Sequence, residues 1–159
     1  MMIHIPGVTD KGIATEQITE FVDLFPTLAE AAGLPPVPRC PWHSQNVTLC
    51  TEGTSLMPLV RHPNRTDWKN KAFSQYPRKA HRDPTAAMGY TMRTQHFRYT
   101  EWVRFRKAPK YEPRWDAVVG VELYDHGVDP EENENVYKRP EYKDTVKELS
   151  RMLHKGWRG

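Results

Sequence analysis

The sequence predicts an α/β fold in two parts: an α/β part over residues 1–60, and a small antiparallel α+β part over residues 61–159. Three observations support this division. A strand-like segment runs directly into a short helix near the N-terminus. Several alternating segments then follow one another, and the C-terminal segment has apolar side chains at helical spacing. Alternation of strand and helix is typical of an α/β layer, whereas successive strands joined by short turns are typical of an antiparallel sheet.

The first part contains two expected strands and a helix. Residues 1–7 are apolar and end at a Pro-Gly turn, which predicts a short strand with His4 as a hydrogen-bonded core residue. A free amino terminus within such a strand is unusual, so we expect that Met1 is not the native start. Residues 18–24 have apolar side chains on both alternating faces, which favours a strand buried on both sides.

A short helix is expected directly after this second strand. Pro26 is tolerated in a first helical turn, and the following residues favour a helix that Gly33 ends. Asp23 lies at the junction, where capping of this helix is its expected role. A loop over residues 34–54 and one further helical turn over residues 55–61 complete the first part.

The loop after the helix contains both cysteines of the chain, Cys40 and Cys50. A disulfide between them would close a short loop and contribute roughly 2–3 kcal/mol. Asn46 begins a glycosylation sequon in the same loop, and Asn64 begins a second one in another polar loop. These features favour an oxidising, glycosylating compartment. The alternative is a cytosolic protein with two free thiols; a zinc site is less favoured, because no second ligand pair has the usual spacing.

The second part is expected to contain an antiparallel sheet and a terminal helix. The pair Gln95-His96 occupies the position of a two-residue hairpin turn, and Asp129-Pro130 marks a later turn. The C-terminal segment has Lys and Arg in its last turns, as a helix C-terminus favours. The predicted strands cover residues 71–76, 88–94, 97–105 and 121–124, and the predicted helix covers residues 140–156 with Val146, Leu149, Leu153 and Trp157 on its apolar face.

Two segments carry a resemblance to a known family. VDLFPTLAEAAGLP, at residues 22–35, resembles the strand-to-helix segment of the sulfatases, and VELYDHGVDPEENENVY, at residues 121–137, resembles their C-terminal ELYDL..DPxExxN segment. The resemblance implies an alkaline-phosphatase-like sulfatase fold, with residues 1–60 as the C-terminal end of its large α/β domain and residues 61–159 as its small C-terminal antiparallel subdomain. PPVPRCP followed by Cys50, AFSQYPR at residues 72–78 and the segment at residues 88–103 are similar to members that remove the 2-O-sulfate of iduronate in heparan and dermatan sulfate. The resemblance covers most of this chain but only about the C-terminal third of a sulfatase.

The family's reactive groups have no counterpart among these residues. Sulfatases carry a Cys-x-Pro-Ser-Arg segment whose cysteine becomes formylglycine, carboxylate and amide ligands for calcium, and His and Lys residues that bind sulfate. Here Cys40 is followed by Pro-Trp-His and Cys50 by Thr-Glu-Gly. The resemblance therefore implies no catalytic and no metal residue in this chain, which we expect to be inactive alone. Calcium and formylglycine would belong to the missing N-terminal sulfatase part, the expected partner, and the parent would be lysosomal with its targeting signal outside this chain.

Candidate substrate-binding residues come from local basic clusters, since the formal net charge is only +3. We expect Arg78, His81 and Arg82 to contact a sulfated glycosaminoglycan, because the planar arginine fork suits carboxylate and sulfate oxygens. Arg104 and Arg106 share a strand face and could form one edge of a polyanion groove, and Arg98 has the same parity. Tyr76 and Trp102 could stack on sugar rings or be core aromatics. For any single basic residue the alternative is a solvated surface charge.

A second class of function remains open: a non-catalytic module that binds glycosaminoglycans or other polyanions. It predicts cooperative folding and salt-dependent binding, whereas a sulfatase fragment should be poorly soluble alone, because Ile3, Ile5, Val22 and Leu24 lack their sheet neighbours. No nucleic acid partner is expected, since no recognition motif is present. No membrane partner is expected, since no apolar run approaches the roughly 20 residues that a span requires.

Overall fold

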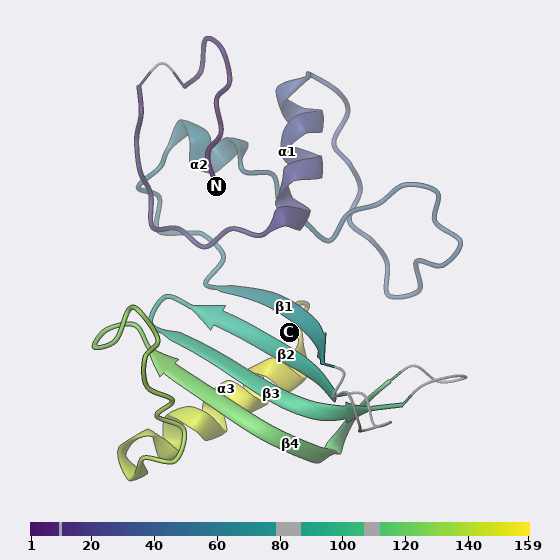
Figure 1. Cartoon of the computed structure of the whole chain (residues 1–159). Coiled ribbons are helices and arrows are strands. Elements are labelled where there is room, and N and C mark those ends of the chain that lie inside the picture. The colour runs from purple at the N-terminus through teal and green to yellow at the C-terminus, as the bar shows by residue number, and fades with distance from the viewer. Residues whose placement is uncertain (10, 79–86, 107–111) are drawn as a thin grey trace. The chain divides into compact units, whose positions relative to one another are not determined.

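The computed structural model describes residues 1–9, 11–78, 87–106 and 112–159 (Figure 1). The chain divides into two compact units, Met1–Asn70 and Lys71–Gly159, here called unit 1 and unit 2. The sequence suggested a boundary at residue 60; that the two parts are the end of a large domain and a small subdomain of a parent enzyme stays a prediction. No helix among the described residues has the length and apolar character that a bilayer crossing needs.

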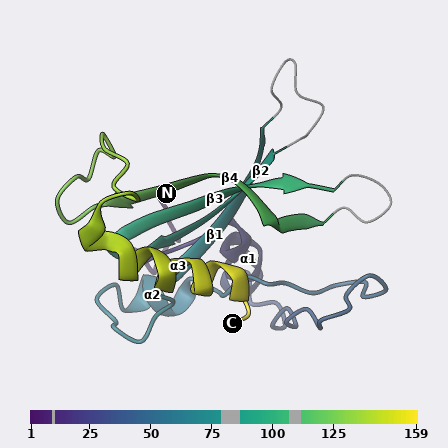
Figure 2. The same ribbon diagram turned by 90° about the horizontal axis from the view of Figure 1, so that it is seen from below.

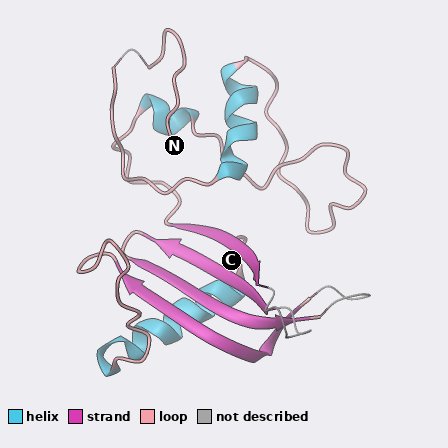
Figure 3. Cartoon of the chain, in the orientation of Figure 1, coloured by secondary structure: helices cyan, strands magenta, loops and turns pink. Residues whose placement is uncertain are grey.

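Unit 1 consists of short helices joined by long loops (Figure 3). The predicted helix is confirmed: Gly33 has a φ of +69°, the left-handed conformation that commonly follows a helix end. The predicted turn near residue 57 is confirmed too. A small core of Ala29, Leu56, Met57 and Leu59 lies between the two α-helices. The elements of unit 1 are η1 (Phe21–Asp23), α1 (Leu24–Ala31) and α2 (Met57–Arg61).

Both strands expected in unit 1 are wrong. Residues 1–7 form no regular element, and His4 is exposed, with its Nδ1 3.1 Å from the hydroxyl of Thr9. Residues 17–20 are irregular and continue into η1, where Phe21 and Val22 point to solvent. A strand needs a neighbour to satisfy its backbone groups, and the described part of unit 1 offers one isolated bridge, between Arg39 and Thr51.

Unit 2 is a four-stranded antiparallel sheet in the order β1-β2-β3-β4. The predicted hairpin turn at Gln95-His96 is confirmed, since Arg93 pairs with Arg98 across it and Thr94 Oγ1 accepts from the Phe97 amide at 3.0 Å. The last strand is much longer than expected. The strands are β1 (Lys71–Arg78), β2 (Ala87–Thr94), β3 (Phe97–Phe105) and β4 (Pro113–Asp125).

One face of this sheet is covered by α3 (Lys143–Lys155), which follows η2 (Pro140–Tyr142) (Figure 2). The terminal helix was predicted, and its Leu149 and Leu153 are buried as expected. Trp157 is not part of the core: it is 62% exposed, because Gly156, with a φ of +73°, ends the helix before it. The core of unit 2 contains Met92, Tyr99, Leu123, Val136, Leu149 and Leu153.

The opposite face of the sheet carries the candidate functional residues. Strand alternation places Met92 and Tyr99 toward α3 and their neighbours on the other side. We call that other side the outer face of unit 2. Neither helix of unit 2 packs on it within the described residues, so its side chains are held by the strands and by one loop. The outer face contains Tyr76, Arg78, Gly89, Thr91, Arg93, Arg98, Thr100, Trp102, Arg104, Glu122 and Tyr124.

Candidate functional site

Trp102 lies flat across the outer face because glycines flank it on both neighbouring strands. It pairs with Gly89 on β2 and with Gly120 on β4. A Cβ atom built at Gly89 would lie 2.8 Å from Cζ3 of the indole, so the six-membered ring occupies the space above that glycine. The indole N–H donates to Glu122 Oε1 at 2.7 Å. The ring is therefore fixed in its plane and extends toward β1.

Arg78, the favoured binding residue from sequence, lies at the end of β1 on this same face. Its side chain is exposed, and its guanidinium carbon is 5.7 Å from the centre of the Trp102 ring. Such stacking orients an arginine while its N–H groups stay free to donate at the edge. Tyr76 is also on this face and is 68% exposed, so it is not a core aromatic. His81 and Arg82, the other two predicted binding residues, lie outside the described residues.

Arg104 is a second exposed arginine at the same end of the outer face as Arg78. The register pairs both Arg78 and Arg104 with Ala87 on the strand between them. Their Cα atoms are thus two strand spacings apart, roughly 10 Å. Arg104 is exposed, and neither arginine forms an ion pair with an acidic group in the described ranges.

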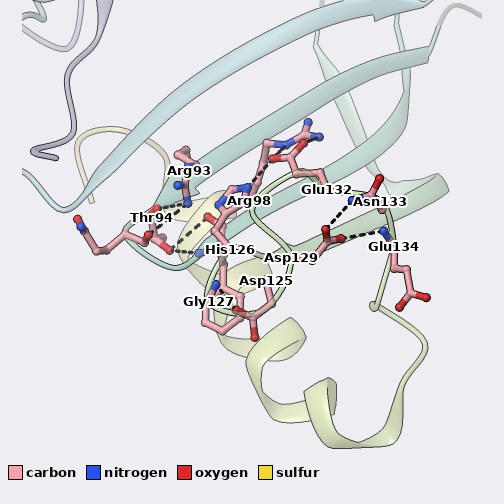
Figure 4. A network of polar contacts seen from close by, with 12 residues as sticks. Arg93, Thr94, Arg98, Asp125, His126, Gly127, Asp129, Glu132, Asn133 and Glu134 are labelled. Carbon is pink, nitrogen blue, oxygen red and sulfur yellow. Dashed lines mark hydrogen bonds and ion pairs between the residues drawn. The ribbon is translucent and has the colours of Figure 1, made fainter.

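The arginines of the predicted groove edge, Arg104 and Arg106, and Arg98 with the same parity, differ in their partners. Arg98 donates from Nε to Glu132 Oε1 at 2.7 Å, and its second nitrogen pairs with the other oxygen (Figure 4). Arg106 pairs with Glu112 at 2.9 Å. Of the three, Arg104 alone has no acidic partner among the residues described. Arg98 and Arg106 therefore have structural partners that local sequence did not show.

Glu132 is the centre of a polar network at the hairpin end of the outer face (Figure 4). Its Oε1 also lies 2.6 Å from Nε2 of His126, and its backbone has a positive φ of 58°. Burial by itself would raise the pKa of Glu132, but hydrogen bonds from Arg98 and His126 and the charge of Arg98 lower it overall. Arg98 also stacks on Tyr124 at 4.7 Å. The network fastens the loop after β4 to β3.

The loop after β4 is further ordered by acidic side chains that cap its own backbone (Figure 4). Asp125 accepts from the Gly127 amide at 2.9 Å, and Asp129 accepts from the Glu134 amide at 2.9 Å and from Asn133 Nδ2 at 2.9 Å. These bonds lower the pKa of Asp129. The predicted turn at Asp129-Pro130 is confirmed, and its acidic residues serve structure.

A buried carboxylate on the helix side of the sheet was missed by sequence reasoning. Glu101 accepts hydrogen bonds from Tyr99 Oη at 2.8 Å and Ser150 Oγ at 2.6 Å, and His154 Nε2 lies 2.9 Å from its other oxygen. Burial and the bond to Glu101 raise the pKa of Tyr99. The strand parity of Glu101, shared with Tyr99 and Val103, was the available signal. The cluster joins α3 to β3.

Asp23 is fully buried, but it does not cap α1 as expected. Its carboxylate accepts from the backbone amides of Glu20 and Thr54, each at 2.8 Å, and both of its oxygens lie 2.7 Å from Lys69 Nζ. No side-chain bond from Asp23 reaches the amides of α1. The residue instead fastens the loop before α2 and the end of unit 1 to η1, which local sequence could not show.

The cysteine pair forms a disulfide between Cys40 and Cys50, with Cα atoms 4.8 Å apart. This confirms the expected bridge and contradicts the free-thiol alternative. Asn46 and Asn64 are exposed, as a glycosylation acceptor must be, and their modification stays a prediction. In the parts of the chain that the structure describes, no group of three or more His, Cys, Asp or Glu side chains is arranged to hold a metal ion.

Comparisons with known proteins place these features in a family. Residues 1–158 match the family described as N-sulphoglucosamine sulphohydrolase, C-terminal. Iduronate 2-sulfatase of Mus musculus is 37% identical over 149 residues, which cover 80% of this chain and 26% of that protein. The Homo sapiens enzyme is 34% identical over 146 residues with the same coverage. N-acetylglucosamine-6-O-sulfatase of Bacteroides thetaiotaomicron is 24% identical over 155 residues, which cover 96% of this chain and 24% of that protein.

Solved structures share the fold. A protein in complex with its substrate D-glucosamine-2-N,6-O-disulfate aligns with a TM-score of 0.54 at 25% identity, covering 84% of this chain and 22% of that one. The phosphonate monoester hydrolase of Agrobacterium radiobacter aligns with a TM-score of 0.57 at 19% identity, covering 87% of this chain and 25% of its own. This chain spans about a quarter of the length of the curated relatives it matches. The chain belongs to the sulfatase family, as a C-terminal region of the alkaline-phosphatase-like fold that resembles iduronate 2-sulfatase.

Proposed function

We propose that this chain is the C-terminal part of a sulfuric ester hydrolase that removes the 2-O-sulfate of iduronate in heparan and dermatan sulfate. The observation that carries the proposal is the 37% identity with mouse iduronate 2-sulfatase over 80% of this chain. A relative and a solved neighbour whose names include sulfated glucosamine substrates support the broader class, a sulfated sugar. The role of this part is to shape the substrate pocket, with Arg78 as the residue that meets an anionic group of the sugar.

The reactive groups of the parent lie outside this chain in this proposal. Cys40 and Cys50 are bonded to each other, so neither is available for conversion to formylglycine. In the parent, formylglycine would supply the nucleophile for the sulfate ester, and calcium would stabilise charge on the sulfuryl oxygens. We therefore expect the isolated chain to have no sulfatase activity.

The partner we propose for this chain is the remainder of the sulfatase. The first turns of unit 1 expose large apolar side chains: Phe21 is 82% exposed, Leu28 67% and Phe25 48%. Such a concentration of apolar surface is typical of a face that another element covers. Since the matched relatives are about four times as long as the aligned region, the rest of the enzyme is the occupant that we infer.

The compartment we propose is the lysosome, reached through the secretory pathway. The disulfide and the two exposed sequons support this assignment. When this chain is fused to a signal peptide and secreted from mammalian cells, its electrophoretic mobility should shift in two steps on glycosidase treatment. Loss of one step in Asn46→Gln and of the other in Asn64→Gln would identify the sites, and no shift in the unsubstituted chain would contradict the proposal.

A chimera tests the activity. This chain would replace the matching C-terminal quarter of mouse iduronate 2-sulfatase, and sulfate release would be measured from a disaccharide with a non-reducing 2-O-sulfated iduronate. The matched control carries the corresponding region of the Bacteroides thetaiotaomicron enzyme. We expect release by the first chimera and none by the control or by this chain alone. A secreted, folded first chimera that releases no sulfate would overturn the assignment.

A further inference from the structure

Two arginines on the outer face of unit 2 have no acidic partner among the described residues, although acidic groups lie nearby. On the same face, Arg98 is paired with Glu132, and Arg93 donates to the carbonyl of Thr94 at 2.6 Å. Arg78 and Arg104 have no such acceptor in the ranges that the structure describes, and both are exposed. Arg104 pairs in register with Arg114, whose neighbour Asp116 is paired with Arg114 itself, and Glu122 accepts from the indole N–H of Trp102. Within the described residues, the positive charges of Arg78 and Arg104 thus have no ion-pair partner at this end of the face.

The spacing of these two arginines suits a ligand with two anionic groups. Both pair in register with Ala87, whose small side chain leaves room between them. With Cα atoms roughly 10 Å apart, two arginine side chains can reach inward to opposite sides of one sugar ring. A uronate with a 2-O-sulfate offers a carboxylate and a sulfate on opposite sides of its ring, and the arginine fork binds either one through two hydrogen bonds.

An aromatic surface lies beside the arginine pair. Trp102 is held flat above Gly89, which lies two residues along β2 from Ala87, and Tyr76 flanks the same glycine from β1. The indole supports the Arg78 guanidinium, and the exposed Tyr76 ring offers a face on which the C–H side of a sugar can stack. The next row of the face carries Thr91 and Thr100, joined by a 2.8 Å hydrogen bond.

We propose that the outer face of unit 2 binds a 2-O-sulfated uronic sugar between Arg78 and Arg104, with Trp102 as the positioning residue that orients Arg78. The inference rests on the proposed function, from which it takes the ligand class. To the proposed contact of Arg78 it adds a second arginine, Arg104, and two aromatic side chains, Trp102 and Tyr76, for which the sequence left a structural role open as the alternative. Arg104 is here a binding residue rather than a solvated charge.

The test is direct binding to the 159-residue chain, without catalysis. The probe is a heparin-derived tetrasaccharide with 2-O-sulfated uronates, followed by calorimetry and by the Trp102 indole N–H signal in NMR spectra. Arg78→Gln and Arg104→Gln should each weaken binding about ten-fold, as the loss of one charged hydrogen-bonded contact implies. Arg78→Lys, which retains the charge but lacks the fork, should weaken it by a similar factor. The matched control is Arg151→Gln on the exposed side of α3, expected to change binding by less than about two-fold.

Each outcome decides the inference. Equal losses in all three glutamine variants, or equal competition by dextran sulfate, would show general charge attraction and overturn it. Circular dichroism confirms that each variant is folded, and Trp102→Phe, which keeps an aromatic ring, should weaken binding less than Arg78→Gln. The two proposals fail separately: sulfate release by the chimera with no selective binding would overturn only this inference. Selective binding without release would overturn only the assigned reaction.

Discussion

The contact between Trp102 and Gly89 can be tested by adding one methyl group. In Gly89→Ala the new Cβ would lie 2.8 Å from Cζ3 of the indole and 3.0 Å from Cε3 and Cη2. Carbon atoms pack best at about 3.5–4.0 Å, so the ring must lift from the sheet. Overpacking of this kind costs about 1–3 kcal/mol. We expect Gly89→Ala to destabilise unit 2 by that amount.

Gly120→Ala provides a matched control on the other side of the same ring. Its new Cβ would lie 3.5 Å from Cδ1 and 3.7 Å from Cβ of Trp102, which is ordinary contact. Where the backbone allows it, replacing glycine by alanine stabilises by about 0.4–1 kcal/mol, because the unfolded chain loses freedom. We therefore expect a neutral or slightly stabilising effect from the same chemical change.

Thermal unfolding followed by circular dichroism measures both variants. For a domain of this size, 1 kcal/mol shifts the Tm by about 4–8 °C. A double-mutant cycle with Trp102→Phe then separates the ring contact from any effect on the backbone, and we expect a coupling energy of about 1 kcal/mol between positions 89 and 102. Equal Tm shifts in Gly89→Ala and Gly120→Ala, or zero coupling, would refute the placement of the indole above Gly89.

Three further predictions concern stability. Asp23→Ala should destabilise unit 1 by about 3–5 kcal/mol, because it leaves Lys69 without its closest buried partner. The control Asp67→Ala breaks an exposed ion pair and should leave the denaturation midpoint almost unchanged. Similar effects of the two substitutions would contradict the role of Asp23. The lowered pKa of Glu132 contributes stability that is present above its unfolded pKa of about 4.3 and is lost as the pH falls through the lower folded value. Glu132→Gln should therefore flatten the acid limb of a stability profile below about pH 5, and an unchanged limb would argue against the network. Reduction of the disulfide, or Cys40→Ser with Cys50→Ser, should lower the stability of unit 1 by about 2–3 kcal/mol, measured as faster amide exchange there, and unchanged exchange would contradict it.

Local patterns predicted unit 2 well because its contacts are close in sequence. The hairpin at Gln95-His96 joins two strands whose alternation is visible in the sequence, and β3 has the predicted bounds. The first half of β4 was not predicted. Pro113, Asp116 and Gly120 are poor strand formers, and this half pairs with β3 through register shifts, so only its partner strand explains it.

The expected strand at residues 18–24 failed for a related reason. Apolar residues on alternating faces describe a buried segment, and a short buried segment can take different backbone conformations. Here no neighbouring strand within the described part of unit 1 pairs with it, and Asp23 accepts the Glu20 amide and turns the chain into η1. Among residues 21–23 only Asp23 is buried, and its burial comes with hydrogen bonds to backbone amides and an ion pair with Lys69 rather than with apolar packing.

The basic residues show the same division between near and distant partners. Strand parity placed Arg98 and Arg104 on one face, as the register confirms. The pairing of Arg98 with Glu132 joins residues 34 positions apart in the sequence, and the outer face offers Arg104 no such carboxylate among its described residues. Parity depends on backbone geometry alone, whereas the presence of an acidic partner depends on where a distant loop is folded.

The sequence by itself determined the family, the disulfide pair, the helix that ends at Gly33, and the order of strands and terminal helix in unit 2. These follow from motifs, turn residues and periodicity within short stretches of chain. Only the tertiary structure decided the burial of Asp23 and Glu101, the position of the Trp102 ring, and which arginines have acidic partners. Those properties depend on side chains that meet across strands or loops, and the free energy of such contacts is set by distances that local sequence does not contain.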